Sequence, residues 1–258
     1  MEINLSGRNA IITGGSKGIG LAIATRLAAS GANVAIIARS REPLNIAVNE
    51  ITKSAKGHVL GFQADVSKAS DVQSAYEEVV GSFSKVDILI NNAGISRSMP
   101  FEQVTDEILD EDLQLKLFAA VRLSRLVLPG MKEQGWGRII NVLNIAAKAP
   151  REKSTPTSIS RAAGMALTKA LSREYAPYNI LVNALLVGFI EADQHIQAAK
   201  RENIKIEDYY RRYEKDIPLG RAGKAEEFAN VACLLVSDQG GYVTGTAINI
   251  DGGSSPVV

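Results

Sequence analysis

Residues 8–20 read RNAIITGGSKGIG, an apolar run followed at once by a glycine-rich turn. The run has the length of a buried strand, and the apolar spacing of residues 18–30 predicts a helix after the turn. Gly14, Gly18 and Gly20 give the turn the pattern Gly-x-x-x-Gly-x-Gly. Glycines there allow a tight bend and let the backbone approach an anion at the helix N-terminus. The stretch therefore predicts a strand–turn–helix unit that binds a nucleotide pyrophosphate.

The same alternation of strand and helix continues along the whole chain. Apolar runs predict strands at 8–13, 33–38, 59–64, 86–91, 138–143, 180–187 and 246–250. Helical spacing predicts helices at 18–30, 43–55, 68–83, 106–133, 157–175 and 224–236. Strands that are apolar throughout are typical of a sheet with helices on both faces. We therefore predict an α/β fold, a doubly wound parallel sheet in a single domain over residues 1–258.

Composition excludes several classes of protein. The 258 residues carry 29 Lys and Arg against 28 Asp and Glu, so a nucleic-acid or acidic-membrane partner is not expected. One cysteine, Cys233, and two histidines are too few for a disulfide or a metal cluster, so we expect no metal. The start MEINL lacks the features of a signal peptide, and no apolar run reaches the roughly 18 residues of a membrane span. We expect a cytoplasmic protein.

The end of the second predicted strand favours one nicotinamide cofactor over the other. An NAD site commonly has Asp or Glu about 20 residues after the glycines, where it accepts from the ribose 2′-hydroxyl. This chain has Ala38 and Arg39 there, and Lys17 lies inside the glycine turn. Two cations suit a 2′-phosphate, so the sequence predicts NADP(H). The alternative is that both side chains are merely solvated.

A mostly charged segment, 189–217, interrupts the alternation after the sixth predicted strand. Ligands of open α/β sheets bind beyond the carboxyl ends of the strands, and this segment follows such an end. We interpret it as a helical lid over the site; the alternative is a solvated pair of helices.

Motifs spread over the chain resemble those of the short-chain dehydrogenase/reductase family. The matching stretches are Thr13 to Gly20, Asp65-Val66, Asn91 to Gly94, Asn141-Val142, Ser160 to Gly164, Val182 to Ala184 and Asp251 to Gly253. The resemblance implies a Rossmann fold, a small-molecule substrate and a homotetramer or homodimer with helices 106–133 and 157–175 at one subunit interface. It implies cofactor contacts by Gly14, Ser16, Lys17, Gly18, Ile19, Gly20, Arg39, Asp65, Val66, Asn92, Ala93, Gly94, Arg161 and Ile190.

The family's catalytic positions hold other residue types here. Members of the family use an Asn, a Ser and a Tyr-x-x-x-Lys pair. Aligned through the neighbouring motifs, these four positions are occupied by Lys116, Asn144, Thr157 and Arg161. The resemblance implies that these are the catalytic residues of this chain, with an altered proton donor.

Elementary chemistry assigns roles to these four side chains. The hydroxyl of Thr157 is too weakly acidic to replace a phenol of pKa about 10, whereas the amide of Asn144 can donate to a substrate oxygen. Arg161 can fork to ribose hydroxyls but keeps its proton. Lys116 lies on an apolar stripe beside Arg161, so burial and like charge should depress its pKa. We hypothesise that Lys116 donates the proton, directly or through water.

Other roles stay open for these and nearby residues. Lys116 could instead reach solvent or pair with Glu111 or Asp112. The segment 189–217 supplies other candidate acids, Tyr209, Tyr210 and Tyr213. Several loop cations could face an anionic substrate or only solvent: Arg97, Lys148, Arg151 and Lys153. His58 and His195 lack partners at a meaningful spacing, and we interpret both as surface residues.

Three functions are compatible with these features. We prefer an NADP(H)-dependent oxidoreductase with an altered proton relay that acts on a small carbonyl or alcohol. A lyase or isomerase that uses Lys116 and Asn144 without redox chemistry is the second. The third is an NADP-binding protein without catalysis. It stays open because function argued from family analogy is weaker than function argued from a site.

Overall fold

A seven-stranded, all-parallel sheet forms the centre of the computed structural model, which describes residues 2–258 apart from the side chains of residues 193 and 194. The strand order is β3-β2-β1-β4-β5-β6-β7. The strands are β1 (Asn9–Thr13), β2 (Asn33–Ala38), β3 (Val59–Gln63), β4 (Ile88–Asn91), β5 (Gly137–Asn144), β6 (Ile180–Val187) and β7 (Ala247–Ile250). The predicted doubly wound parallel sheet is confirmed.

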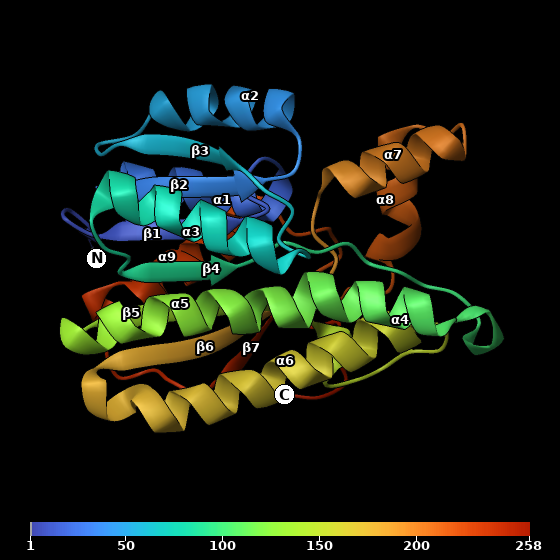
Figure 1. Cartoon of the computed structure of the whole chain (residues 1–258). Helices are drawn as coiled ribbons and strands as arrows, with labels where there is room; N and C mark the ends of the chain where they lie inside the picture. The colour runs from blue at the N-terminus through green and yellow to red at the C-terminus, as the bar shows by residue number, and fades with distance from the viewer. Residues whose placement is uncertain (1) are drawn as a thin grey trace.

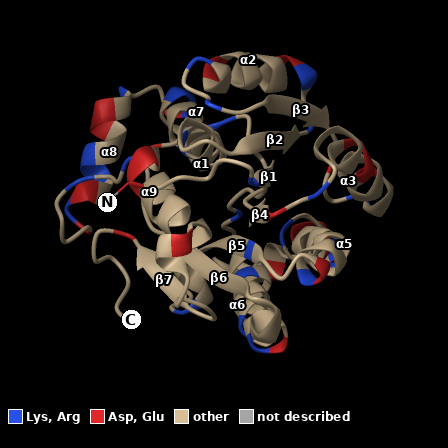
Figure 2. Ribbon diagram, turned by 90° about the vertical axis from the view of Figure 1, so that its left-hand side faces the viewer, with Lys and Arg blue, Asp and Glu red and all other residues tan. Residues whose placement is uncertain are grey.

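Helices cover both faces of this sheet (Figures 1 and 2). On one face lie α1 (Gly18–Ala29), α2 (Arg41–Thr52) and α9 (Ala225–Val236), and on the other α3 (Ala69–Phe83), α5 (Ala119–Glu133) and α6 (Thr155–Tyr175). Short 3-10 turns occupy Phe101–Gln103, Ile145–Ala147, Ala176–Tyr178 and Asp238–Gly240. The predicted strand at 86–91 begins two residues late, and the predicted helix at 43–55 lies at Arg41–Thr52.

Hydrophobic cores on both faces hold the layers together. Successive side chains of a strand point to opposite faces. Ile12 accordingly packs with Leu27 of α1 and Phe228 of α9, whereas its neighbour Ile11 packs with Val72 of α3 and Leu123 of α5. This is why apolar residues occupy consecutive positions in the strands.

The predicted helix over 106–133 is not one regular helix. It consists of α4 (Asp106–Leu113), a π-helical turn over Gln114–Phe118 and α5. A π turn accommodates an extra residue and is frequent at functional sites. The prediction of a continuous α-helix was wrong at this turn, because apolar spacing over 28 residues does not reveal one local change of winding.

The charged segment after β6 forms two helices, α7 (Asp193–Arg201) and α8 (Ile206–Glu214). In Figure 1 they lie at the end of the molecule toward which the strand arrows point. Phe189, just before them, contacts the rings of His195 and Tyr213, with centroids 4.5 Å and 4.8 Å away. None of the helices in the described part of the chain is long and apolar enough to cross a membrane.

Candidate cofactor and substrate site

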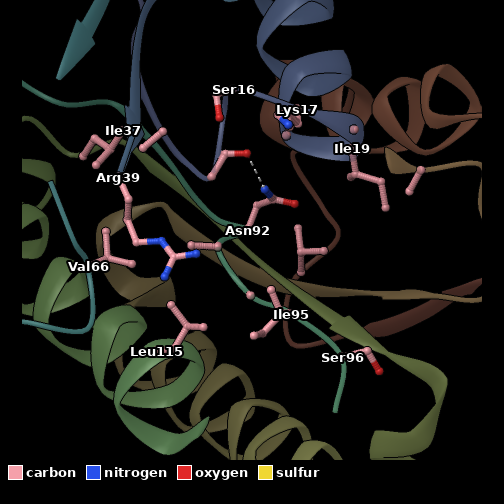
Figure 3. A pocket seen from close by; sticks show the side chains of 18 of the residues that line it. Ser16, Lys17, Ile19, Ile37, Arg39, Val66, Asn92, Ile95, Ser96 and Leu115 are labelled. Carbon is pink, nitrogen blue, oxygen red and sulfur yellow. Dashed lines mark hydrogen bonds between the residues drawn. The ribbon is translucent and has the colours of Figure 1, made fainter. Parts of the chain in front are cut away.

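A cavity of about 490 Å³ lies at the carboxyl ends of the central strands (Figure 3). The turns after β1 and β4 both line it, and the strand order reverses between these two neighbouring strands. Such a switch point is where open α/β sheets bind their ligands. The lining residues are Gly14, Ser16, Lys17, Gly18, Ile19, Gly20, Ile37, Ala38, Arg39, Ser40, Pro43, Ala64, Val66, Asn92, Ala93, Gly94, Ile95, Ser96, Leu115, Val142, Leu143, Asn144, Thr157, Arg161, Val187 and Ala192.

The glycine turn is shaped by both conformation and close contact. Gly14 and Gly18 have φ of +66° and +53°, values that side chains rarely tolerate. A Cβ on Gly20 would lie 2.2 Å from the carbonyl oxygen of Gly14, whereas a Cβ on Gly18 would meet nothing within 4 Å. Open space therefore adjoins the first residue of α1, where helix N–H groups without partners favour an anion. The turn fits a pyrophosphate.

Asn92 joins the turns after β1 and β4. Its Nδ2 donates to the carbonyl oxygens of Thr13 (2.9 Å) and Gly14 (3.2 Å), as Figure 3 shows for one of these contacts. The hydroxyl of Thr13 in turn accepts from the backbone N–H groups of Asn92 and Ala93 at 2.9 and 3.0 Å. These bonds hold Ala93 and Gly94 in the cavity wall.

The outer end of the cavity is basic. Lys17 and Arg39 both line it, and the Arg39 side chain extends past Val66 toward the middle of the cavity in Figure 3. Asp65, an expected cofactor residue, is not in the lining. Its carboxylate accepts from the N–H (3.1 Å) and hydroxyl (2.8 Å) of Ser67. Burial raises the pKa of the Asp65 carboxyl. The hydrogen bonds from Ser67 and the positive charge of Arg39 lower this pKa by more, so it lies below the ordinary value for Asp.

Ile190 also does not line this cavity, although the sequence grouped it with the cofactor residues. It is 4% exposed, belongs to the core and forms an isolated parallel bridge with Gly223. Its side chain faces a separate hollow of about 110 Å³. The sequence shows that Ile190 lies near a strand end, but it does not show in which direction the side chain points.

Asn144, Thr157 and Arg161 meet at the inner end of the cavity. They come from the end of β5 and the first turns of α6, which approach closely because Gly164 lacks a side chain. A Cβ there would lie 2.7 Å from Leu143 Cδ2. The structure thus brings together three residues that the sequence separates by up to 17 positions.

Arg161 lies against Gly94 across the cavity wall. One of its terminal nitrogens donates to the carbonyl oxygen of Val142 at 2.7 Å, and a Cβ on Gly94 would lie 2.6 Å from the other. Burial lowers the pKa of Arg161 to about 10, which Asp112 partly opposes, so the guanidinium stays charged near neutral pH. Its buried Nε has no hydrogen-bond partner among the described residues.

Lys116 lies behind the lining and not in it. The residue is 6% exposed, and its ammonium pairs with Asp112 and lies 3.0 Å from the hydroxyl oxygen of Thr157. Burial, together with the positive charge of Arg161, lowers the pKa of Lys116 to about 8 despite the pairing with Asp112. Two possibilities that the sequence left as alternatives are therefore both true: the lysine is buried with a depressed pKa, and it is paired with Asp112.

The other candidate residues lie outside the cavity lining. Arg97 pairs with Glu111 at 2.7 Å, and Lys148 donates to the carbonyl oxygen of Ala247 at 2.6 Å. Arg151 and Lys153 are exposed. None of Tyr209, Tyr210 and Tyr213 lines the cavity, and burial, with a contribution from Tyr213, raises the pKa of Tyr209 to about 12.

His195 is not the plain surface residue that the sequence suggested. Its ring lies 4.5 Å from Phe189 and 5.8 Å from Tyr209, and burial lowers its pKa. Sequence reasoning also missed Asp112 as a partner of Ser160, whose hydroxyl donates to the carboxylate at 2.6 Å. The spacing of four between Asp112 and Lys116 was a signal for one contact, but no local pattern links Asp112 to α6.

Comparison with known proteins agrees with this fold. A family model described as Enoyl-(Acyl carrier protein) reductase matches residues 14–255. The 3-oxoacyl-(acyl-carrier-protein) reductase FabG of Aquifex aeolicus (strain VF5) is 35% identical over 98% of this chain and 99% of its own. The FabG of Escherichia coli (strain K12) is 32% identical over 97% of this chain and 98% of its own.

Solved structures give the same result. The L-sorbose reductase of Gluconobacter frateurii, complexed with NADPH and L-sorbose, superposes with a TM-score of 0.96 at 33% identity, covering 100% of both chains. The chain therefore belongs to the short-chain dehydrogenase/reductase family.

Proposed function

We propose that this protein is an NADP(H)-dependent oxidoreductase that interconverts a small carbonyl compound and its alcohol. The observation that carries the proposal is the charge of the cavity. Lys17, Arg39 and Arg161 line it, and no Asp or Glu is among its described lining residues. Three cations in one cavity lining suit a ligand with several phosphates. The NADPH bound to the sorbose reductase is such a ligand.

The cavity residues divide the cofactor between them. The glycine turn and the N-terminus of α1 bind the pyrophosphate, and Arg39 and Lys17 bind the 2′-phosphate. Asp65 stabilises the turn in which it lies, by accepting hydrogen bonds from Ser67. Val66, in the same turn, packs beside the adenine. Arg161 lines the inner end of the cavity, and its guanidinium donates toward the ribose hydroxyls. When bound, the nicotinamide supplies or accepts the hydride.

Residues at the inner end of the cavity bind the substrate oxygen and transfer its proton. Asn144 donates its amide to that oxygen, and Thr157 is the proton carrier between the substrate and Lys116, 3.0 Å behind it. In the structure the Thr157 hydroxyl lies 3.2 Å from the carbonyl oxygen of Arg97, to which it donates. It turns this hydrogen to the substrate oxygen and takes a proton from Lys116. The tetrad is thus altered in residue type but keeps a hydrogen-bonded path.

The surroundings of the site complete the proposal. α7 and α8 act as a lid beyond the strand ends, and the substrate has access beneath them. The protein is cytoplasmic and assembles as a homotetramer or homodimer through the surfaces of α5 and α6. Neither a nucleic acid nor a membrane is a partner.

Absorbance at the nicotinamide band tests the reaction directly. The purified protein is mixed with NADPH and a panel of small aldehydes, diketones, ketoses and keto acids, with NADH as the matched control. We expect loss of NADPH absorbance with at least one carbonyl, faster than with NADH. Substrate conversion at constant absorbance would instead indicate a lyase or isomerase. Binding of NADPH without any conversion would indicate a non-catalytic NADP-binding protein.

A further inference from the structure

We infer that Asp112 is the positioning residue of this site, which keeps Lys116 protonated and directs its ammonium at Thr157. The inference rests on the proposed function, in which Lys116 supplies the proton. Asp112 is not among the residues that line the cavity, so it acts on the site through its contact with Lys116.

Asp112 differs from every other acid on its helix. The α4 segment is strongly acidic, but Asp106, Glu107, Asp110 and Glu111 are exposed, whereas Asp112 is 2% exposed. Burying a carboxylate is costly unless it is paired and hydrogen-bonded. Both of its oxygens are in fact used, one by Lys116 and one by the hydroxyl of Ser160 at 2.6 Å.

These contacts close a ring that connects α4, the π turn and α6. Lys116 lies in the π turn and reaches both Asp112 and the Thr157 hydroxyl. Ser160, one turn further along α6, lies within hydrogen-bond distance of Asp112 and of the Thr157 carbonyl oxygen (3.1 Å). The ammonium therefore has one defined direction, with Asp112 on one side and Thr157 on the other.

The charges that face Lys116 come from three elements. Asp112 on α4 is the anion, and Arg161 on α6 and Arg97 in the loop after β4 are cations. Glu111 is occupied with Arg97, 2.7 Å away. Without the charge of Asp112, the ammonium would be buried against two cations and would lose its proton at lower pH. A neutral Lys116 cannot supply the proton for carbonyl reduction.

Asp112→Asn is the discriminating variant, because it removes the charge and keeps an acceptor for Lys116. Asp110→Asn is its matched control: it makes the same chemical change two residues earlier, at an exposed site bonded to Gln114. Asp112→Glu restores the charge. The measurement is the pH profile of kcat/KM for NADPH-dependent reduction, together with NADPH affinity by fluorescence.

We expect the basic limb of the Asp112→Asn profile to move to lower pH by about one unit or more. At pH 8 this is a loss of about fivefold or more, because Lys116 with a pKa of about 8 is half protonated there in the wild type, with NADPH affinity unchanged. Asp110→Asn keeps the wild-type profile, and Asp112→Glu recovers most of it. An equal loss of activity at every pH would overturn the inference, because it would mean that Asp112 only joins two helices.

A second readout does not depend on turnover. The NMR signal of the Lys116 amine, assigned by its loss in Lys116→Arg, is titrated in the NADPH-loaded protein. Its midpoint should fall in Asp112→Asn, and an unchanged midpoint would refute the inference even if no carbonyl substrate is found. If Asp112→Asn does not fold, Ser160→Ala is titrated instead. It keeps the charge, so its midpoint should stay near that of the wild type, and a large fall would count against Asp112.

Discussion

Single residues of this site act through their surroundings more than through their type. The hydroxyl of Thr157 is a weak acid, yet it connects the cavity with the buried ammonium of Lys116. Lys116 has an ordinary ammonium, yet burial and Arg161 bring its pKa to about 8. A group with a pKa near the working pH is well suited to general acid–base catalysis. Two predictions belong to this scale.

The first concerns the pH dependence of turnover. Carbonyl reduction needs Lys116 protonated, so kcat/KM should be level below about pH 8 and fall about tenfold per unit above it. Alcohol oxidation should show the opposite limb, rising to a plateau above that pH. Lys116→Arg keeps the charge but does not release its proton, so the limb should disappear with most of the activity. A profile that Lys116→Arg leaves intact would exclude Lys116 as the donor.

The second concerns the choice of cofactor. Arg39→Ala should weaken NADPH binding by roughly 10- to 100-fold, the effect of losing hydrogen bonds to a charged group, and should leave NADH binding nearly unchanged. Arg41→Ala is the control, since Arg41 bonds to Gln63 at 3.0 Å and does not line the cavity. Fluorescence titration with both nucleotides measures the effect. Equal weakening of both nucleotides would contradict a 2′-phosphate site at Arg39.

At the scale of the element, two irregular segments bring the site together. The glycine turn between β1 and α1 leaves open space at the helix N-terminus, and the π turn between α4 and α5 carries Lys116 to α6. Both depart from regular winding where a functional group has to be presented. The regular elements around them supply rigidity.

The two glycines at the start of α1 should respond differently to substitution. Gly18→Ala places its Cβ in open space and retains only the strain of a positive φ, about 1–2 kcal/mol. Gly20→Ala places a Cβ 2.2 Å from the Gly14 carbonyl, so we expect a larger loss, about 3 kcal/mol or more. Urea unfolding without nucleotide measures both. Similar losses would mean that the turn relaxes around Gly20.

At the scale of the whole molecule, the cofactor should stabilise the fold, because its cavity is built from both halves of the sheet. Saturation at about 100 times Kd is worth about 2.7 kcal/mol. For a chain of this size that corresponds to a rise in Tm of roughly 5–10 °C. Calorimetry should show this rise with NADPH and a smaller one with the same concentration of NADH. No rise with NADPH at any concentration would argue against the cavity as its site.

Much of the fold and of the cofactor end could be predicted from the sequence, because their signals are local. Continuous apolar runs such as residues 88–90 of β4 mark buried parallel strands, and Gly14 to Gly20 directly follow another strand, β1. Asp65 and Ile190 show the limit of this reasoning. Asp65 lies between the lining residues Ala64 and Val66, and Ile190 lies two residues before Ala192, but a strand or turn points nearby side chains in different directions.

The sequence by itself determined the parallel sheet, the position of the nucleotide turn and the cations Lys17 and Arg39 beside it, since periodicity and neighbouring residues carry that information. Only the tertiary structure decided that Lys116 lies behind the cavity, that Asp112 is its buried partner and that Ser160 completes the ring. The reason is physical: burial, pairing and pKa depend on packing between α4, the π turn and α6, and residues more than 40 positions apart along the chain come into contact only in the fold.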